Sequence, residues 1–182
     1  QVLDYAILVI SASDGIQGYT RTVWKLLSQY QIPVFLFINK MDQPGADKKR
    51  LMQELKTALE DGCVDFTEAH SAGEAYQNFA ESVAMCEEKT LEYFLENDQV
   101  ENEQIRHLIR TRRLFPCYFG SALKLTGVQE FLDGMAEYMD ETSYPEEFGA
   151  RVFKIARDEA NNRLTYLKVT GGSLKVKMPF AE

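Results

Sequence analysis

The clearest chemical signal in the sequence is the tetrapeptide Asn39-Lys40-Met41-Asp42, which directly follows the apolar residues 34–38. A carboxylate can accept two parallel hydrogen bonds, and guanine presents two such donors side by side, its ring N–H and its exocyclic amino group. Adenine lacks this pair of donors, so a buried aspartate facing the base would be left without partners if adenine entered. Asp42 is therefore a candidate reader of guanine.

The two residues at the start of this tetrapeptide suit the same task. Asn39 can bond the edge of a purine or tie adjacent loops together. The methylene stem of Lys40 can lie along the plane of the base while its ammonium group reaches solvent or the sugar oxygen. Chance supplies the three fixed residue types in roughly 2% of chains of this length. The competing interpretation is an ordinary polar loop between a strand and a helix.

A second short motif, Gly120-Ser121-Ala122-Leu123, follows the apolar residues 114–119. The small side chain of Ala122 would let its backbone N–H approach the 6-keto oxygen of guanine, and Ser121 can brace the loop. Because ligands collect at the carboxyl ends of parallel strands, both motifs are expected to face one pocket. Alone the second motif is weak, but together the two motifs favour a guanine site.

The elements that must position these motifs follow an alternating strand and helix pattern. Residues 5–10 and 34–38 are continuous apolar runs, typical of parallel strands that are covered on both faces. Between them Val23, Leu27 and Tyr30 recur at helical spacing. A strand, a helix and a strand in this order predict a parallel pair with a right-handed crossover.

Helical patterns continue on both sides of the third strand, residues 114–119. An acidic stretch, followed by a capping box at Asp98 and Glu101, predicts a helical insertion over about residues 66–113. After the third strand, Thr126 is expected to cap a further helix. These patterns indicate an α/β fold with a mostly parallel sheet and a helical insertion.

The last part of the chain has a different periodicity. From residue 149 apolar and polar residues alternate, which predicts antiparallel strands at residues 152–156, 163–169 and 173–178. Turn residues separate these strands at 161–162 and 171–172. Three strands within 34 residues fall below the roughly 40 residues that an independent fold usually needs. The segment is therefore expected to be the start of a second domain.

Composition limits the remaining possibilities. The 182 residues include 28 acidic and 20 basic side chains, for a net charge of −8. No apolar run approaches the roughly 18 residues of a membrane span, so no membrane partner is expected. The acidity lies in residues 1–148, with 25 acidic and 13 basic side chains, whereas residues 149–182 have 3 and 7. Contact with RNA is therefore expected, if anywhere, on the basic strands, and no DNA partner is expected.

Cysteine and histidine usage favours neither disulfides nor metal binding. Cys63, Cys86 and Cys117 are odd in number and include no pair spaced for metal binding or redox exchange. They indicate a reduced, cytoplasmic compartment. His70 and His107 lie outside any ligand spacing, so no metal ligand is assigned to the chain.

With both guanine motifs in place, the chain resembles the translational GTPases of the elongation factor G class. The resemblance covers nearly the whole chain and rests on residues 2–12, 14–17, 38–45 and 120–124. Residues 152–155 and 163–166 look closer to the tetracycline-resistance ribosomal protection proteins.

The resemblance implies that guanine of GTP or GDP contacts six residues: Asn39, Lys40, Asp42, Ser121, Ala122 and Leu123. It also implies that residues 1–141 are the C-terminal part of a P-loop GTPase domain, that 142–148 are a linker, and that 149–182 begin a β-barrel domain. The partner that it implies for the full-length parent is the ribosome.

The phosphate-binding half of such a site is not found in this sequence. No glycine is followed five residues later by Gly-Lys, the pattern of a phosphate-binding loop. The resemblance places that loop and the magnesium-binding segment upstream, so Mg²⁺ is expected only through residues outside this chain. No catalytic residue is assigned, and the 182 residues alone are not expected to hydrolyse GTP.

One alternative from a different class remains open. The chain could be a non-catalytic protein-interaction module with a GTPase-like core that no longer uses nucleotide. It would then use the acidic helical region and Trp24 as a binding surface. The simpler interpretation of these features is a solvated helix face and a core tryptophan.

Overall fold

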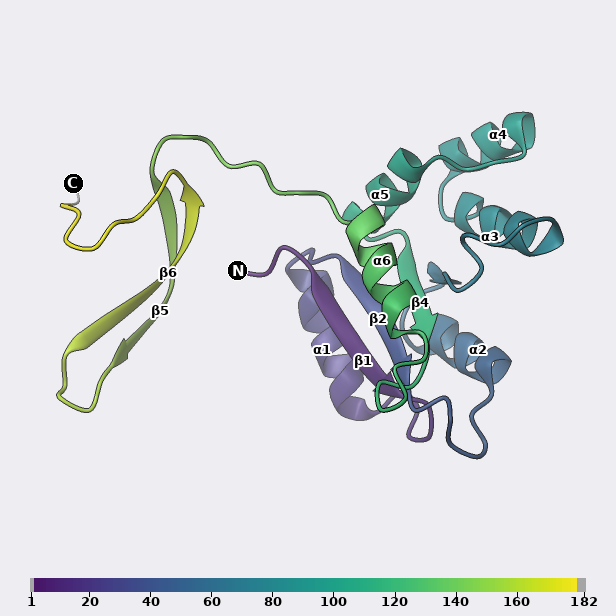
Figure 1. Ribbon diagram of the computed structural model, residues 1–182, viewed down its shortest axis with the longest axis horizontal. Helices are drawn as coiled ribbons and strands as arrows, with labels where there is room; N and C mark the ends of the chain where they lie inside the picture. The colour runs from purple at the N-terminus through teal and green to yellow at the C-terminus, as the bar shows by residue number, and fades with distance from the viewer. Residues whose placement is uncertain (1, 180–182) are drawn as a thin grey trace. The chain divides into compact units, whose positions relative to one another are not determined.

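The computed structural model describes residues 2–179 and divides into two compact units. Residues 4–140 form the first unit, and the other described residues form the second. Figure 1 shows the first unit as a sheet with helices around it and the second as a two-stranded ribbon.

The sheet of the first unit contains four parallel strands in the order β1-β2-β4-β3. Their bounds are β1 (Ala6–Ser11), β2 (Val34–Asn39), β3 (Cys63–Asp65) and β4 (Phe115–Phe119). Because all four strands are parallel, their carboxyl ends meet at one edge of the sheet. The predicted α/β fold with a parallel sheet is confirmed.

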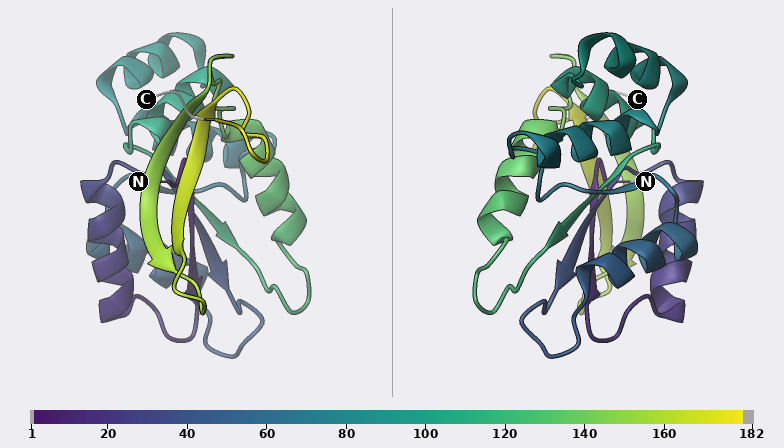
Figure 2. Two further views of the ribbon diagram at one scale, coloured as in Figure 1. Left: turned by 90° about the vertical axis from the view of Figure 1, so that its left-hand side faces the viewer. Right: turned by 90° about the vertical axis from the view of Figure 1, so that its right-hand side faces the viewer.

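Six helices surround this sheet (Figures 1 and 2). Their bounds are α1 (Gly18–Gln29), α2 (Lys48–Ala58), α3 (Glu74–Ala84), α4 (Glu88–Asn97), α5 (Asn102–Arg110) and α6 (Val128–Tyr138). Helices α3, α4 and α5 lie between β3 and β4 in the sequence, where the helical insertion was expected. Within residues 2–179 no helix is both long and apolar enough to cross a membrane.

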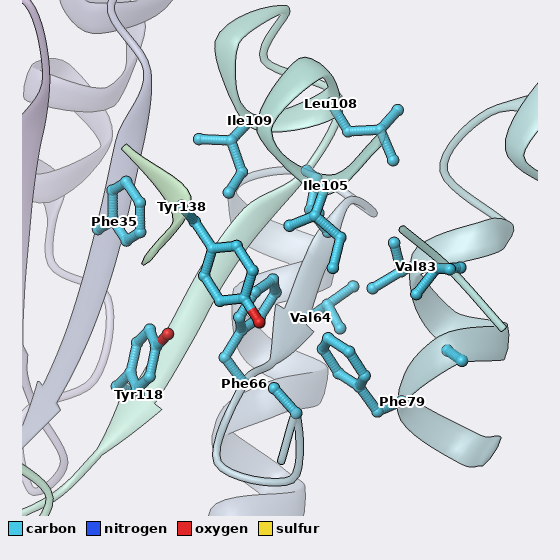
Figure 3. Packing of buried hydrophobic residues seen from close by; sticks show 14 of the residues in the cluster. Phe35, Val64, Phe66, Phe79, Val83, Ile105, Leu108, Ile109, Tyr118 and Tyr138 are labelled. Atoms are coloured by element: carbon cyan, nitrogen blue, oxygen red, sulfur yellow. The ribbon is translucent and has the colours of Figure 1, made fainter. Parts of the chain in front are cut away.

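Two apolar clusters fill the two sides of the sheet. On one side, Trp24 of α1 and Leu55 of α2 pack against Val34 and Leu36 of the strands. On the other side Phe66 contacts Phe79 of α3, with ring centroids 5.0 Å apart, and Tyr138 of α6, with centroids 5.4 Å apart (Figure 3). Successive residues of the buried strands thus pack against helices on opposite faces of the sheet. This packing on both faces holds the strands, and the loops at their carboxyl ends, in position.

The structure differs from the sequence-based expectation in three places of this unit, one strand and two helix starts. Strand β3 was not expected, because it contains only three residues and shows no extended apolar run. Helix α6 begins after Gly127, which has a left-handed backbone, and Thr126 makes no side-chain cap. The expected box at Asp98 and Glu101 is shifted, because Glu101 itself caps α5 together with Gln104.

Strand β1 is also less covered than expected. We expected it to be buried on both faces, but Ile7 and Val9 are 51% and 59% exposed. β1 is the outer strand of the four, and α1 covers only the face that bears Leu8 and Ile10. Position in the sheet, rather than apolar composition, decides the burial of a strand.

The second unit contains the antiparallel pair β5 (Gly149–Arg157) and β6 (Arg163–Gly171). The third strand expected at residues 173–178 is wrong for this structure, because the segment forms a turn in which the Met178 N–H donates to the Lys175 carbonyl. An alternating pattern becomes a strand only where a neighbouring edge is available for pairing.

Candidate nucleotide site

The two sequence motifs lie on loops that leave adjacent strands. β2 and β4 pair in register, with Ile38 opposite Phe119. Beyond the strands the Gly120 N–H donates to the Ile38 carbonyl at 2.9 Å, and the Met41 N–H donates to the Gly120 carbonyl at 3.0 Å. The backbone ladder therefore continues past the strand ends and holds the two loops together.

Asn39 makes a further link between these loops. Its side-chain oxygen Oδ1 accepts hydrogen bonds from the backbone N–H of Lys40 at 2.8 Å and of Ala122 at 2.9 Å. Of the two roles foreseen for Asn39, the structure thus shows the one that ties loops together. It also shows the Ala122 N–H, which was expected to face guanine, donating to Asn39.

Asp42 stands opposite the second loop. Its carboxylate oxygen Oδ2 lies 3.2 Å from the Nζ atom of Lys124, and 24% of its side chain is exposed. Hydrogen bonding from the Ser121 hydroxyl, followed by Lys124, lowers the pKa of Asp42 below its ordinary value. The group is consequently an ionised acceptor at neutral pH.

The second loop is tight, and its shape depends on glycine. The Ser121 N–H donates to the Thr126 carbonyl, and the Thr126 N–H donates back to the Ser121 carbonyl, at 2.9 and 3.1 Å. A Cβ atom at Gly120 would lie 2.1 Å from the same Thr126 oxygen. Only glycine fits this closely packed position. Ser121 is 3% exposed, which agrees with a bracing role.

Lys40 and Leu123 are both exposed. Lys40 adopts a left-handed backbone with φ of 64°, an uncommon conformation for a residue with a side chain. The Asn39 side chain holds the Lys40 N–H in place. Leu123 is 90% exposed. The structure therefore gathers Asn39, Asp42, Ser121 and Ala122, with Lys40 beside them, and leaves the Leu123 side chain in solvent.

Two residues of the site were missed as contributors from the sequence. Lys124 pairs with Asp42, and Gly120 permits the close approach of the loops. The sequence shows a lysine directly after the second motif, but only the pairing of β2 with β4 shows that Asp42 is its partner. No cluster of three metal-binding side chains occurs in residues 2–179.

Comparison with known proteins places this site in a family. The family model of the elongation factor Tu GTP-binding domain matches residues 1–141. The chain belongs to the elongation factor Tu GTP-binding domain family. The match includes both loops of the candidate site and the helical insertion between them, so the family resemblance drawn from the motifs is confirmed.

Relatives of this family member extend the comparison. The chain is 28% identical over 194 residues to the tetracycline resistance protein TetP of Clostridium perfringens, and the match covers 96% of the chain and 30% of TetP. A crystal structure of a Thermus thermophilus protein has the same fold, with a TM-score of 0.75 at 20% identity over 96% of this chain and 33% of that one. The chain thus spans about a third of the length of both relatives.

Proposed function

We propose that residues 4–140 are the guanine-recognising part of a translational GTPase that acts on the ribosome and, at full length, binds and hydrolyses GTP. Membership in the elongation factor Tu GTP-binding domain family supports the proposal. The observation that carries it is the pairing of an ionised Asp42 with the Ser121 loop at the carboxyl edge of β2 and β4.

In the proposed complex, the Asp42 carboxylate accepts the ring N–H and the exocyclic amino group of guanine. Lys124, whose Nζ atom lies 3.2 Å from Asp42 Oδ2, releases the carboxylate, or shares it, as the base enters. The Ala122 N–H exchanges Asn39 Oδ1 for the 6-keto oxygen of guanine, and the stem of Lys40 lies along the base. The Asp42 carboxylate and the Ala122 N–H then gain partners that adenine cannot provide.

Residues 4–140 are not proposed to bind the phosphates or Mg²⁺ of the nucleotide. Mg²⁺ in such a site neutralises charge on the transferred phosphoryl group. The described residues offer no cluster of acidic side chains that fits the ion, so no step is assigned to it here. What residues 4–140 contribute is selection and orientation of the base.

The test is a change of base preference in an Asp42→Asn variant of the chain. An amide donates where the carboxylate accepted, so the variant should lose affinity for GDP and gain affinity for xanthosine diphosphate, which offers an oxygen in place of the amino group. Competition binding with GDP, xanthosine diphosphate and ADP measures the change. Unaltered GDP affinity in the variant contradicts the assigned role of Asp42.

The alternative function, a protein-interaction module that does not use nucleotide, is not supported by the position of Trp24. It needed an accessible Trp24 surface, but the Trp24 side chain is 5% exposed and its ring packs against Phe115 with centroids 4.7 Å apart. The tryptophan ring belongs to the core. The alternative then depends on the acidic helices alone, and specific GDP binding by the chain would exclude it.

A further inference from the structure

Basic side chains are concentrated in one part of an otherwise acidic unit. Residues 18–58, which include α1 and α2, contain seven basic and three acidic side chains. Residues 1–148 as a whole contain 13 basic and 25 acidic side chains. More than half of the cations therefore lie in about a quarter of this sequence, and they create a local field opposite in sign to that of the rest.

Four of these seven cations, Arg21, Lys25, Lys49 and Arg50, line a groove between α1 and α2. The groove consists of two hollows of about 610 and 380 Å³, which share Arg21 and Ala58. The larger hollow is lined by Arg21, Lys49, Arg50, Gln53, Glu54, Thr57 and Ala58. The smaller hollow adds Trp24, Lys25 and Leu59 among its walls. None of these residues belongs to the candidate nucleotide site.

The acidic residues in the walls of this groove, Glu54 and Glu60, form no ion pair with its cations in the described part of the chain. Within residues 2–179, Arg21, Lys25, Lys49 and Arg50 form no ion pair, and all four side chains are exposed. The carboxylate of Glu54 is already engaged, because its Oε1 atom accepts from the Ile16 N–H at 2.8 Å. The positive charge is therefore available to a partner from outside the chain.

A buried hydrogen-bond donor of Trp24, which lines the smaller hollow, and a second donor of Arg112 beside it also have no acceptor. The Nε1 atom of Trp24 and the Nη2 atom of Arg112 are buried without a partner in the described part of the chain. The guanidinium carbon of Arg112 lies 5.1 Å from the centroid of the Trp24 ring, so the two donors belong to one neighbourhood. A buried donor without an acceptor raises the free energy of the folded state, and an oxygen atom of a ligand would remove this cost.

We propose that the α1–α2 groove binds an acidic segment of a partner protein, with carboxylates on the four cations and an oxygen at the Trp24 N–H. A peptide fits better than nucleic acid, because it can place carboxylates at the cations and neutral side chains beside Glu54 and Glu60, whereas nucleic acid carries a negative charge at every phosphate. Apolar atoms of Trp24, Ala58 and Leu59 give a peptide the side-chain contact that a phosphate backbone cannot use.

The experiment uses Trp24, the only tryptophan of the 182 residues, as its reporter. The chain is titrated with three probes, a capped 16-residue peptide of Glu and Leu with helical spacing, the same peptide with Lys in place of Glu, and a 16-nucleotide single-stranded RNA. We expect the acidic peptide alone to change the Trp24 fluorescence and to bind more weakly as salt rises. Absence of binding to the acidic peptide, or tighter binding of the RNA, overturns the proposal.

A matched pair of variants locates the site. Replacing Arg21 and Arg50 with glutamine should weaken binding of the acidic peptide by about tenfold, because two unpaired charges are lost. Lys89→Gln, an exposed change on α4, removes a positive charge elsewhere and should leave the affinity unaltered. Weakening by Lys89→Gln of half the size or more, on a free-energy scale, would mean that overall charge alone attracts the peptide, which contradicts a site in the groove. GDP binding is measured in parallel and should be the same in all three proteins.

Discussion

At the scale of single residues, Asn39 links the two loops of the candidate site. One side-chain oxygen accepts from two backbone N–H groups, one on its own loop and one on the loop after β4. The first bond also holds Lys40 in its left-handed conformation. Asn39 therefore organises the site whether or not it touches the base.

A first prediction concerns this link. Asn39→Ala removes the oxygen that accepts both hydrogen bonds and should lower the free energy of unfolding by roughly 1–3 kcal/mol, because two N–H groups lose their partner. Asn39→Asp keeps an accepting oxygen and should recover most of the loss. Urea denaturation of the three proteins compares them. If alanine and aspartate variants were equally unstable, the two hydrogen bonds would not be what stabilises the loops.

A second prediction concerns the pH dependence of guanine binding. The Ser121 hydroxyl and Lys124 lower the pKa of Asp42 from 3.8, so the charged form is favoured in the folded chain. The stabilisation from the charged group is present above the unfolded pKa and is lost as pH falls through the lowered folded value. GDP affinity should hence show no Asp42 titration between about pH 5 and 8. A midpoint near pH 6 in wild type that is absent in Asp42→Asn contradicts this assignment.

The sequence predicted the acceptor and the two loops at this scale, because each needs particular residue types at fixed spacing. It did not predict that the Ala122 N–H would donate to Asn39 or that Lys124 would face Asp42. Both contacts join residues about 80 positions apart, and only the pairing of β2 with β4 brings them together. Motifs define side-chain chemistry, whereas partners depend on the fold.

At the scale of elements, α6 lies close to β4 because of one glycine. A Cβ atom at Gly134 would lie 1.8 Å from the hydroxyl oxygen and 2.7 Å from the Cζ atom of Tyr118. Tyr118 is 3% exposed and cannot move aside into solvent. The helix thus gives up favourable helix propensity in exchange for close packing on the strand.

A third prediction follows for this contact. Gly134→Ala should lower the free energy of unfolding by about 1–3 kcal/mol through overpacking, even though alanine favours helices. The matched control is Gly18→Ala in α1, where no atom lies within 4 Å of an added Cβ and the change should be neutral or slightly stabilising. Thermal unfolding compares both variants with wild type. Stabilisation by Gly134→Ala would show that the helix and strand can separate freely.

Long elements could be predicted from their patterns, and short ones could not. Strands β2 and β4 contain the apolar runs from which they were predicted, and α2 begins at an N-cap, since the Asp47 side chain accepts from the Arg50 N–H. Strand β3 was not predicted, because a strand of three residues shows no periodicity. The strand expected at residues 173–178 failed for the opposite reason, since its alternation was clear but no edge pairs with it.

At the scale of the whole molecule, the charge pattern has two parts that the net value of −8 conceals. Basic residues gather on the α1–α2 groove and again in residues 149–182, while the helical insertion is acidic. We propose that residues 149–182 begin a second domain, with residues 142–148 as the linker. Their basic strands remain the proposed place for contact with ribosomal RNA.

A fourth prediction concerns activity of the isolated chain. The 182 residues contain no phosphate-binding loop pattern, and phosphoryl transfer depends on positioned phosphates, Mg²⁺ and an oriented water molecule. The purified chain should therefore release no phosphate from GTP above the rate of an Asp42→Asn control. A steady-state phosphate-release assay with Mg²⁺ present measures this. Turnover clearly above the control would mean that the chain supplies its own phosphate site.

The most direct test of the guanine site is an amide chemical-shift titration of the isotopically labelled chain with GDP and, separately, with ADP. Both nucleotides present the same phosphates and sugar, so only the base differs. We predict that amides of residues 39–42 and 120–124 shift with GDP and remain unchanged with ADP, the Ala122 amide among them as it exchanges its acceptor. Equal shifts with both nucleotides, or shifts confined to other residues, would contradict guanine recognition at this edge of the sheet.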